Sequence, residues 1–251
     1  MTNALTEQAG WRGAFVTMGL GGGGIVALVC FFGIPARPAG RDRSTGGRAS
    51  ETKGMTIAQA LRTASYIKLL IACFIINLLL QALMTHLVPV PSSDGLARGD
   101  AVKVAGSIGI GLIAGKLVMG AMLDRWNAKL VTTICLVLLT ASFALLGIAH
   151  APGWERLVAV LLLGLASGGL APIFPYLVAR IFGTASFGPL FGAMTTVYAV
   201  ANALGPVGAA KVYDQAHSYS TMLITAPLAL LVAVAMIWSL GRLPEVERKA
   251  D

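Results

Sequence analysis

The sequence predicts an all-α membrane protein with seven transmembrane helices, and three observations support this fold class. Hydrophobic residues make up 56% of the 251 residues and charged residues only 12%, with a mean hydropathy of +0.78, whereas soluble domains carry about 25% charged residues. Long stretches without a charged residue recur along the chain, and a helix of about 20 such residues crosses a bilayer core. These stretches lack the polar/apolar alternation of membrane β-strands and exceed their length of about 10 residues.

The predicted spans follow one another along the chain, separated by charged connections. Each is expected to be a helix, because backbone groups in lipid must bond within their own segment. The spans lie in residues 13–36, 69–93, 104–123 with one interruption at Lys116, 130–154, 157–179, 181–210 and 215–241.

The first span is expected to be a permanent transmembrane helix. Its leader MTNALTEQAG has no basic residue before Arg12, and its apolar stretch is too long for a signal peptide. Residues 19–24 (GLGGGG) match GxGxxG, but a dinucleotide site needs a preceding strand and an acidic residue about twenty positions on. The nearest candidate, Asp42, lies in an Arg-rich stretch typical of a loop. We therefore interpret these glycines as sites of close helix contact or bending.

Residues 35–65 form the only long hydrophilic connection and predict a cytoplasmic linker. It begins PARPAGRDRSTGGRAS, in which Pro, Gly and Ser with charges of both signs cannot bury a core. Residues 55–68 carry apolar residues near the helical period and predict a short surface helix. The predicted organisation is a first transmembrane helix in residues 1–34, the linker, a six-helix bundle in residues 66–241 and a cytoplasmic tail in residues 242–251.

The distribution of basic residues predicts the orientation in the membrane. If the first helix runs from outside to inside, 14 of the 19 Lys and Arg residues fall on the inner half. Positive residues concentrate on the cytoplasmic side, so the amino terminus is expected outside and the carboxyl terminus in the cytoplasm, in a multi-pass protein of the inner cell membrane. The net charge of +8 is thus a topology signal and predicts no nucleic-acid partner. The basic residues on the outer side are Arg12, Arg98, Lys103, Arg156 and Lys211.

Small residues four positions apart predict close contact between helix backbones in three spans. Prolines inside two spans remove backbone donors and bend helices, which favours a cavity or a moving gate as much as simple curvature. Three cysteines fall within apolar spans, and an odd number there argues against disulfides and a metal cluster, so no cofactor is implied. The small residues are Ser107, Gly111, Gly115, Gly164, Gly168, Gly188 and Gly192; the helix breakers are Pro172, Pro175, Gly205 and Pro206; the cysteines are Cys30, Cys73 and Cys135.

Lys116 is the one charged residue well inside a predicted span. A lysine at the bilayer centre costs about 2.5–3.5 kcal/mol on insertion scales, which makes it a candidate for a functional site. It stands eight residues before Asp124 at the inner end, which is about 12 Å at 1.5 Å per residue and close to the midplane. The alternative is that its ammonium reaches toward the inner surface.

Polar side chains at a similar depth could complete a site around this lysine. Asn77 and Gln81 are one turn apart in the second span, and Tyr198 and Asn202 are one turn apart in the sixth. A cation with amides and a phenol suits a small carboxylate, although the amides could instead join neighbouring helices. His86 is either a proton gate or an interfacial histidine, and it is left out of the predicted site.

The stretch GKLVMGAMLDRWNAK at the end of the third span resembles a signature loop of the major facilitator superfamily. Gly120, Asp124, Arg125 and Lys129 occupy the positions of its GxxxDRxxxR/K pattern, while Asn127 stands where glycine is common. The resemblance implies that Asp124 and Arg125 hold a cytoplasmic gate against neighbouring helix ends and the other half of a carrier. The alternative is an ordinary charged loop.

Further stretches resemble the monocarboxylate and oxalate/formate branches of this superfamily. They are HLVP at residues 86–89, three FG pairs in residues 182–192 and GPVGAAKVYDQAHSY at residues 205–219. These branches place a basic residue in the third span, where Lys116 stands in place of the typical arginine and lacks its fork geometry. Oxalate carriers are also expected to have a lysine inside the sixth span, and the absence of one before Lys211 argues against oxalate.

The resemblance covers nearly the whole chain but only the last seven of twelve superfamily helices, since GWRGAF at residues 10–15 resembles the start of the sixth. A complete carrier has two halves around a site at their interface. The chain is therefore expected to be the carboxyl-terminal portion of a secondary transporter of small, monocarboxylate-like organic anions. It would work by alternating access, as a symporter or an antiporter.

The expected partners are the anion, the bilayer and an amino-terminal transporter half or a second copy. The alternative is a truncated, non-transporting fragment, or a half-transporter whose partner supplies the missing helices. An enzyme is not expected, because the spans hold no paired carboxylates, HExxH motif or Ser/His/Asp cluster.

Overall fold

The computed structural model is predominantly helical in the residues that it describes, and these contain no strand. This confirms the predicted all-α class. Most of the predicted linker, the predicted tail, Asp42 and Cys30 lie outside the described residues. The structure describes residues 57–93, 98–148, 153–183 and 186–240, together with separate positions between residues 10 and 32.

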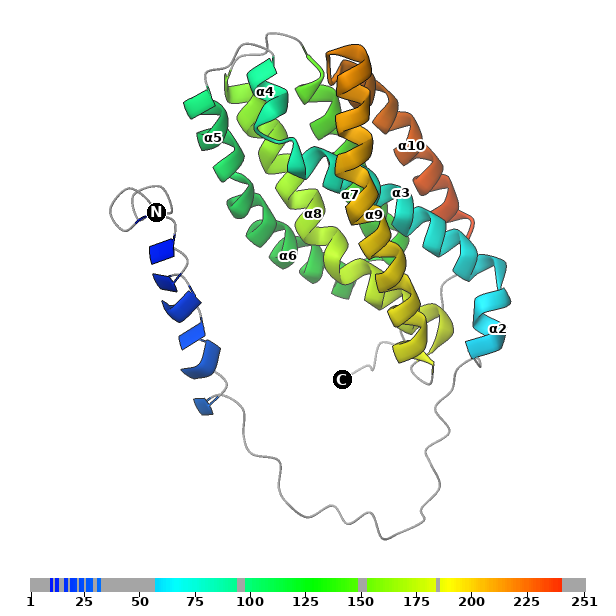
Figure 1. Cartoon of the computed structure of the whole chain (residues 1–251). Helices are drawn as coiled ribbons and strands as arrows, with labels where there is room; N and C mark the ends of the chain where they lie inside the picture. The colour runs from blue at the N-terminus through cyan, green and yellow to red at the C-terminus, as the bar shows by residue number, and fades with distance from the viewer. Residues whose placement is uncertain are drawn as a thin grey trace. The chain divides into compact units, whose positions relative to one another are not determined.

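Six segments are long and apolar enough to cross a membrane, in agreement with six of the seven predicted spans. One of the six, Gly99–Arg125, consists of two consecutive helices. Residues 1–50 form a separate unit, in which an apolar helix covers Gly19–Leu28 at the place of the first predicted span. The helices of the second unit are α2 (Ile57–Arg62), α3 (Ala64–Thr85), α4 (Pro89–Ser93), α5 (Arg98–Gly106), α6 (Ile108–Arg125), α7 (Ala128–Leu146), α8 (Gly153–Phe182), α9 (Phe187–Ala216) and α10 (Ser220–Trp238) (Figure 1).

Two spans end or begin at places other than those predicted. The second span was expected to reach residue 93, but α3 ends at Thr85 and a turn separates it from α4. Pro89 explains this end, because a proline disfavours helical geometry in the residue before it. The third span begins earlier than expected, with α5, and the helix is interrupted only at Ser107, whose hydroxyl donates to the Val104 carbonyl (2.7 Å).

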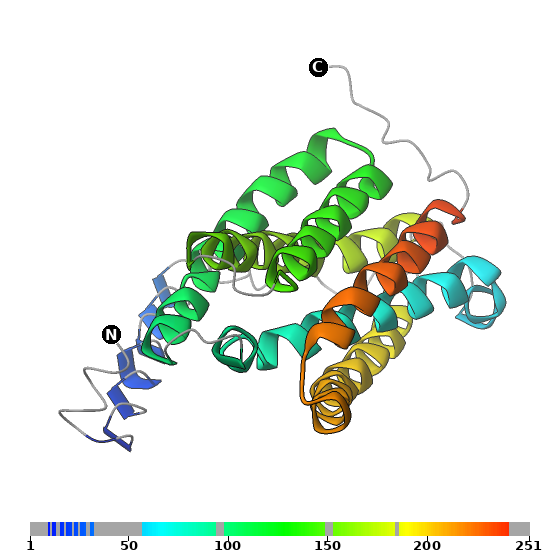
Figure 2. The ribbon, with the colours of Figure 1, turned by 90° about the horizontal axis from the view of Figure 1, so that it is seen from above.

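The bundle consists of two groups of helices. Helices α6, α7 and α8 pack on one another, and α3, α9 and α10 form the second group. Contacts between α7 and α10 join the two groups, and α8 touches α9. Seen from above, α6 and α7 lie on one side of the bundle and α9 and α10 on the other (Figure 2).

Glycines hold α6 and α8 in backbone contact, as the spacing of small residues predicts. A Cβ at Gly111 would lie 2.6 Å from the Leu161 carbonyl oxygen, and one at Gly164 would lie 2.7 Å from the Ile108 carbonyl oxygen. Both distances are shorter than real Cβ contacts. The two helices can therefore approach this closely only because these positions have no side chain.

The α3/α9 pair uses the same device at one position. Gly205 of α9 faces the Leu78 carbonyl oxygen, and a Cβ there would also lie 3.0 Å from the Ala82 nitrogen. Pro206 follows immediately, yet α9 continues to Ala216. The tight contact thus closes α3 against α9 toward the end of α3.

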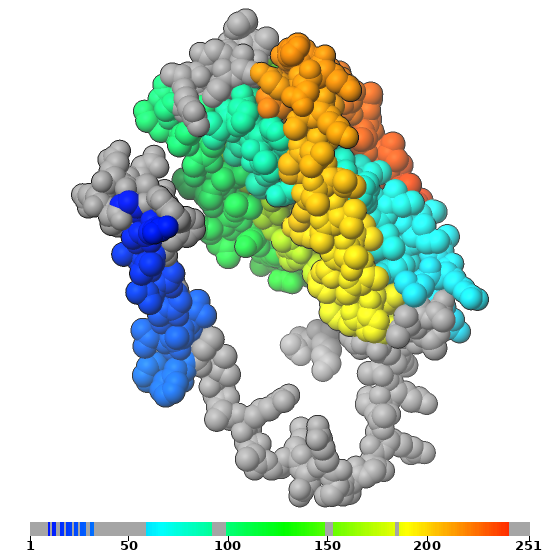
Figure 3. Space-filling view, in the orientation of Figure 1, coloured from blue at the N-terminus to red at the C-terminus, as the bar shows by residue number. Residues whose placement is uncertain are grey.

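The remaining predicted stripe, Gly188 and Gly192, makes no such contact. A Cβ at either glycine would meet no atom within 4 Å among the described residues, so the expected close contact is not formed within this part of the chain. Figure 3 shows α9, from yellow to orange, as a ridge along one face of the second unit. Farther along α9, Val200, Leu204 and Val207 are also exposed.

Candidate functional site

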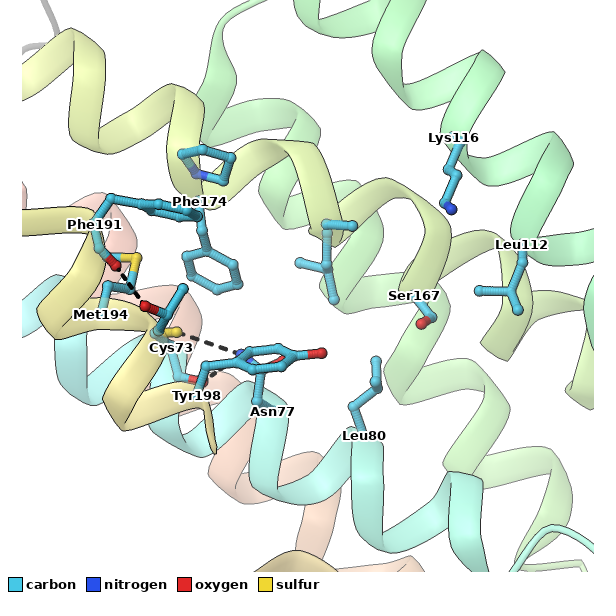
Figure 4. Close-up of a pocket in the computed structure, with 14 residues that line it drawn as sticks. Cys73, Asn77, Leu80, Leu112, Lys116, Ser167, Phe174, Phe191, Met194 and Tyr198 are labelled. Carbon is cyan, nitrogen blue, oxygen red and sulfur yellow. Dashed lines mark hydrogen bonds between the residues drawn. The ribbon is translucent and has the colours of Figure 1, made fainter. Parts of the chain in front are cut away.

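A cavity of about 390 Å³ lies between the two groups of helices. This volume is in the range of small-molecule sites, about 300–1,000 Å³. Its wall comes from α3, α6, α8 and α9, and most of it is apolar (Figure 4). The lining residues are Cys73, Asn77, Leu80, Leu112, Lys116, Ser167, Leu170, Ala171, Phe174, Pro175, Phe191, Met194, Thr195 and Tyr198.

Among the described residues that line the cavity, Lys116 is the only charged one. Its side chain is exposed, and no hydrogen bond or ion pair joins its ammonium to another described residue. The glycine crossing between α6 and α8 fixes the backbone at Lys116. A Cβ at Gly168 would lie 3.0 Å from the backbone nitrogen of Lys116, and Gly115 faces the Leu165 backbone. The crossing that holds α6 against α8 therefore also sets the position of the one cation in the cavity.

Asn77 and Tyr198 line the same cavity from α3 and α9. Asn77 is only 6% exposed, and its amide nitrogen donates to the Cys73 carbonyl (2.8 Å) and to the Cys73 sulfur (3.4 Å). Tyr198 is 43% exposed, and its hydroxyl points toward the side of the cavity where Ser167 and Lys116 lie (Figure 4). The structure thus brings three of the five residues predicted to bind substrate to one cavity.

Gln81 and Asn202 do not line the cavity. Each stands one turn beyond a lining residue, toward the level at which Gly205 brings α9 against the α3 backbone. The two helices are in contact there, and both residues are partly buried. The Asn202 carbonyl oxygen is buried without a hydrogen-bond partner among the described residues. A spacing of four residues shows that two side chains lie on one face of a helix. It does not show at which level along that face a neighbouring helix makes contact.

Sequence reasoning missed several lining residues. Ser167 precedes Gly168, so the glycine that allows the helix crossing also brings this hydroxyl to the cavity. Thr195 stands one turn before Tyr198 on α9, a spacing that could have revealed it. Nothing in the sequence marks Phe174 and Phe191 as cavity residues, because a phenylalanine in a span ordinarily faces lipid or packs in the core.

The signature loop lies at the end of α6. Asp124 and Arg125 end this helix and are both exposed, and Gly120 has open space where a Cβ would stand. Asn127, where the superfamily pattern commonly has glycine, is the N-cap of α7, and its side chain accepts a hydrogen bond from the Lys129 nitrogen (3.0 Å). The departure from the pattern thus supplies a helix cap.

Lys129 differs from the other predicted gating residues because it is buried. Its ammonium donates to the Trp238 carbonyl at the end of α10 (3.1 Å), and the Trp238 indole donates to the Thr133 hydroxyl (2.9 Å). A cation at a helix C-terminus is favourable. Lys129 therefore fastens α7 to α10 within this bundle, whereas Asp124 and Arg125 are available to other partners.

Metal ligation has no support in the described part of the chain, where no three His, Cys, Asp or Glu side chains gather. The cavity offers one ammonium, hydroxyls and an amide within an apolar wall. Such a wall with few polar groups can bind and orient a small polar molecule.

The helical bundle and its central cavity define a protein of the membrane-transporter class of folds. The sequence profile of the Major Facilitator Superfamily matches residues 1–154 and 95–251, and the chain therefore belongs to this family. No curated protein matches the chain.

Among solved structures, the chain is similar to a crystal structure of the E. coli fucose:proton symporter FucP, with a TM-score of 0.65 and 14% sequence identity. The match covers 96% of this chain and 61% of the symporter, so the chain spans about three fifths of that protein's length. At this identity the match shows a shared fold. The family profile, in turn, supports the resemblance to the superfamily that the loop GKLVMGAMLDRWNAK indicated.

Proposed function

We propose that the chain is the carboxyl-terminal portion of a secondary transporter of small organic anions. One observation carries this proposal: Lys116 is the only charged side chain lining the cavity, and no described residue neutralises it. An unpaired ammonium in an apolar wall is costly. A carboxylate that enters the cavity would form a charge-assisted hydrogen bond with it.

The single cation in this chain's part of the cavity wall can pair with one carboxylate, which supports a monocarboxylate as the substrate. This agrees with the resemblance of residues 205–219 to the monocarboxylate and oxalate/formate branches. Asn77 and Tyr198 would orient the substrate. Gln81 and Asn202, which lie beyond the cavity, would contribute only if α3 and α9 separate during transport.

Asp124 and Arg125 would stabilise one state of the cytoplasmic gate. Both are exposed at the end of α6, where they can bind neighbouring helix ends or the other half of the carrier. Alternating access by rocking of two halves needs such contacts that form in one state only. The driving force would be a proton gradient or exchange of anions.

The missing part of the carrier would come from an amino-terminal half or from a second copy of this chain. The matched symporter is longer by about two fifths of its length, and the lining of the cavity includes exposed groups such as Lys116 and Tyr198. In the proposed orientation the amino terminus is outside and the carboxyl terminus cytoplasmic, in the inner cell membrane.

Substitution of Lys116 tests the proposal. The chain in lipid nanodiscs is titrated with a panel of labelled organic acids, and uptake is measured in cells that express it. Lys116→Met should lower affinity for carboxylates by at least about tenfold, because a hydrogen bond to a charged group contributes about 1.5–3 kcal/mol, while Lys116→Arg should retain part of it.

Lys103→Met is the matched control, since this exposed lysine pairs only with Asp100 (2.9 Å) near the start of the third span. Its affinity for carboxylates should equal that of the unmodified chain. Equal binding by the Lys116→Met variant would overturn the proposed anion site.

A further inference from the structure

We infer that Tyr66 is a positioning residue for transport, whose hydrogen bond to the Leu190 carbonyl holds the start of α9 against α3 and closes the inner end of the cavity. The inner end is the one at which α3 and α9 begin, on the cytoplasmic side in the proposed orientation. This inference rests on the proposed transport function and adds to it a gate within this chain. Neither residue lines the cavity.

Helices α3 and α9 meet at two levels. At the inner level the Tyr66 hydroxyl donates to the Leu190 carbonyl (2.7 Å), and among the described residues this is the one hydrogen bond between the two helices. At the other level Gly205 lies against the Leu78 carbonyl oxygen. Every described residue of α9 that lines the cavity lies between these two contacts. The two contacts therefore bound the α9 wall of the cavity at its ends.

The side chains around the Tyr66 hydroxyl form a fully packed layer. Tyr66 and Leu190 are each 0% exposed, and Phe182 at the end of α8 is 1% exposed. The rings of Tyr66 and Phe182 make an edge contact, with centroids 5.4 Å apart. Residues of three helices thus meet at one hydroxyl group. This layer separates the cavity from the inner end of the bundle.

The bond also acts on the wall of the cavity, through the residue that follows Leu190. This residue is Phe191, which lines the cavity and stacks on Phe187 with ring centroids 5.3 Å apart. In the close-up, Phe174 and Phe191 lie on the side of the cavity away from Lys116 (Figure 4). Both Phe187 and Phe191 belong to the first turns of α9. A movement of this end of α9 away from α3 would therefore carry an aromatic part of the cavity wall with it.

The bond can open without unwinding either helix. A carbonyl inside an α-helix accepts from the N–H four residues further on, so Leu190 keeps its bond within α9 when Tyr66 leaves. The Tyr66 hydroxyl has no second acceptor among the described residues, and a buried donor left unpaired is costly. Opening must therefore bring water to this hydroxyl. The contact thus has two states, closed and dry or open and hydrated, as a gate that excludes water requires.

The experiment measures access to a cavity thiol from each side of a bilayer. The full chain with Cys30→Ser is reconstituted in proteoliposomes, so that Cys73 in the cavity wall and Cys135 in the core are its cysteines. A membrane-impermeant thiol reagent is supplied on one side at a time. Tyr66→Phe keeps the ring and removes only the hydroxyl. Labelling of Cys73 from the inner side should rise about two- to tenfold, the equivalent of one net hydrogen bond.

Two controls belong to the same measurement. Tyr176→Phe is the matched variant, because the Tyr176 hydroxyl accepts from Arg180 within α8 and joins no two helices; its labelling should equal that of the unmodified chain. Cys135 is buried beside Gly169 and should stay unlabelled in every variant. Phe182→Leu weakens the same layer from α8 and is a second, independent variant, for which the same one-sided rise is expected.

Binding and uptake separate a positioning role from a merely structural one. In Tyr66→Phe the equilibrium affinity for carboxylates should equal that of the unmodified chain, because Tyr66 does not line the cavity. The rate of uptake should change at least about twofold, because the gate then opens with a different probability. A loss of affinity together with a lower melting temperature would overturn the inference, since it would show a general loosening of the bundle.

The outcomes distinguish this inference from the proposed function, because labelling needs no anion. Unchanged labelling of Cys73 in both variants, an equal rise from both sides, or labelling of Cys135 would overturn the gate. Carboxylate binding that persists in that case, and depends on Lys116, would keep the anion site. A one-sided rise in a chain that binds no carboxylate would support the gate and overturn the anion site alone.

Discussion

Two sets of glycines in this chain share one sequence spacing and have opposite environments. In α6 and in α8, two glycines four residues apart lie against the backbone of the facing helix, in a crossing that leaves no room for a Cβ; they are Gly111 and Gly115, and Gly164 and Gly168. Gly188 and Gly192 on α9 have nothing within 4 Å among the described residues. The spacing therefore shows where a backbone could approach. It does not show whether a partner within the same bundle does so.

The difference is connected to function through Lys116. The α6/α8 glycine crossing sets the position of the α6 backbone at Lys116, since Gly168 lies against the backbone nitrogen of this residue. The open pair lies on an exposed stretch of α9. Substitution by alanine at both kinds of glycine, and at glycines with intermediate surroundings, tests the comparison directly.

The largest effect is expected from Gly115→Ala and Gly168→Ala. The added methyl would meet the backbone carbonyl of Leu165 or Leu112, which cannot turn aside as a side chain can. Overpacking in a core costs about 1–3 kcal/mol and sometimes more, and we expect the upper end or beyond. Thermal unfolding in detergent measures it. In Gly168→Ala, carboxylate affinity should also fall, because Lys116 is displaced.

Gly205→Ala should come next. Its methyl would meet the Leu78 carbonyl and the Ala82 backbone nitrogen, but this is the one described glycine at which α9 meets the α3 backbone, whereas four glycines form the α6/α8 crossing. We expect a loss of about 1–3 kcal/mol in unfolding free energy. Cysteine labelling of Gln81→Cys should increase in the Gly205→Ala background, since separation of the helices opens that level. Unchanged labelling would contradict the explanation given for the position of Gln81.

Gly169→Ala should have a smaller effect than either. Its methyl would meet side chains, with Met119 Cγ at 2.5 Å and Cys135 Sγ at 2.8 Å. Methionine is unbranched and adapts to added volume, so we expect about 1 kcal/mol of destabilisation. A melting temperature as low as that of Gly115→Ala would show that backbone and side-chain contacts are equally rigid here.

Gly188→Ala and Gly192→Ala should not destabilise the chain. Both positions are exposed in α9, and alanine in a helix is favoured over glycine by about 0.5–1 kcal/mol. A slight rise in melting temperature is expected for the isolated chain. A fall comparable to that of the α6/α8 variants would mean that a partner, such as a second copy, occupies this face.

Most of the fold could be predicted from the sequence, because in lipid a helix is defined by its own composition and length. Six spans lie at the places that charge-free stretches predict, and Gly111 and Gly115 lie on the packed face of α6 as their spacing predicts. The end of α3 was missed because Val88 and its neighbours are apolar, while the stop comes from Pro89. Apolar composition predicts membrane immersion but not where a helix ends within it.

The candidate site could be predicted in part. Lys116 could be identified from sequence alone, since a charge in an apolar stretch needs no tertiary information to be conspicuous. Asn77 and Tyr198 share its cavity, whereas Gln81 and Asn202, chosen by the same spacing, lie outside the cavity and toward the level of the contact at Gly205. Ser167 and Thr195 were not identified, because serine and threonine are common in membrane helices and ordinarily bond their own backbone.

By itself the sequence determined that this chain spans a membrane as helices, which stretches do so, and that one ammonium is placed among them. Those properties depend on the transfer of each segment from water to lipid, and each segment carries that free energy alone. The tertiary structure decided which glycines are in contact, which amides face the cavity and that the Lys129 ammonium bonds to the end of α10. Such contacts depend on the distance between two helices, and no single helix specifies that distance.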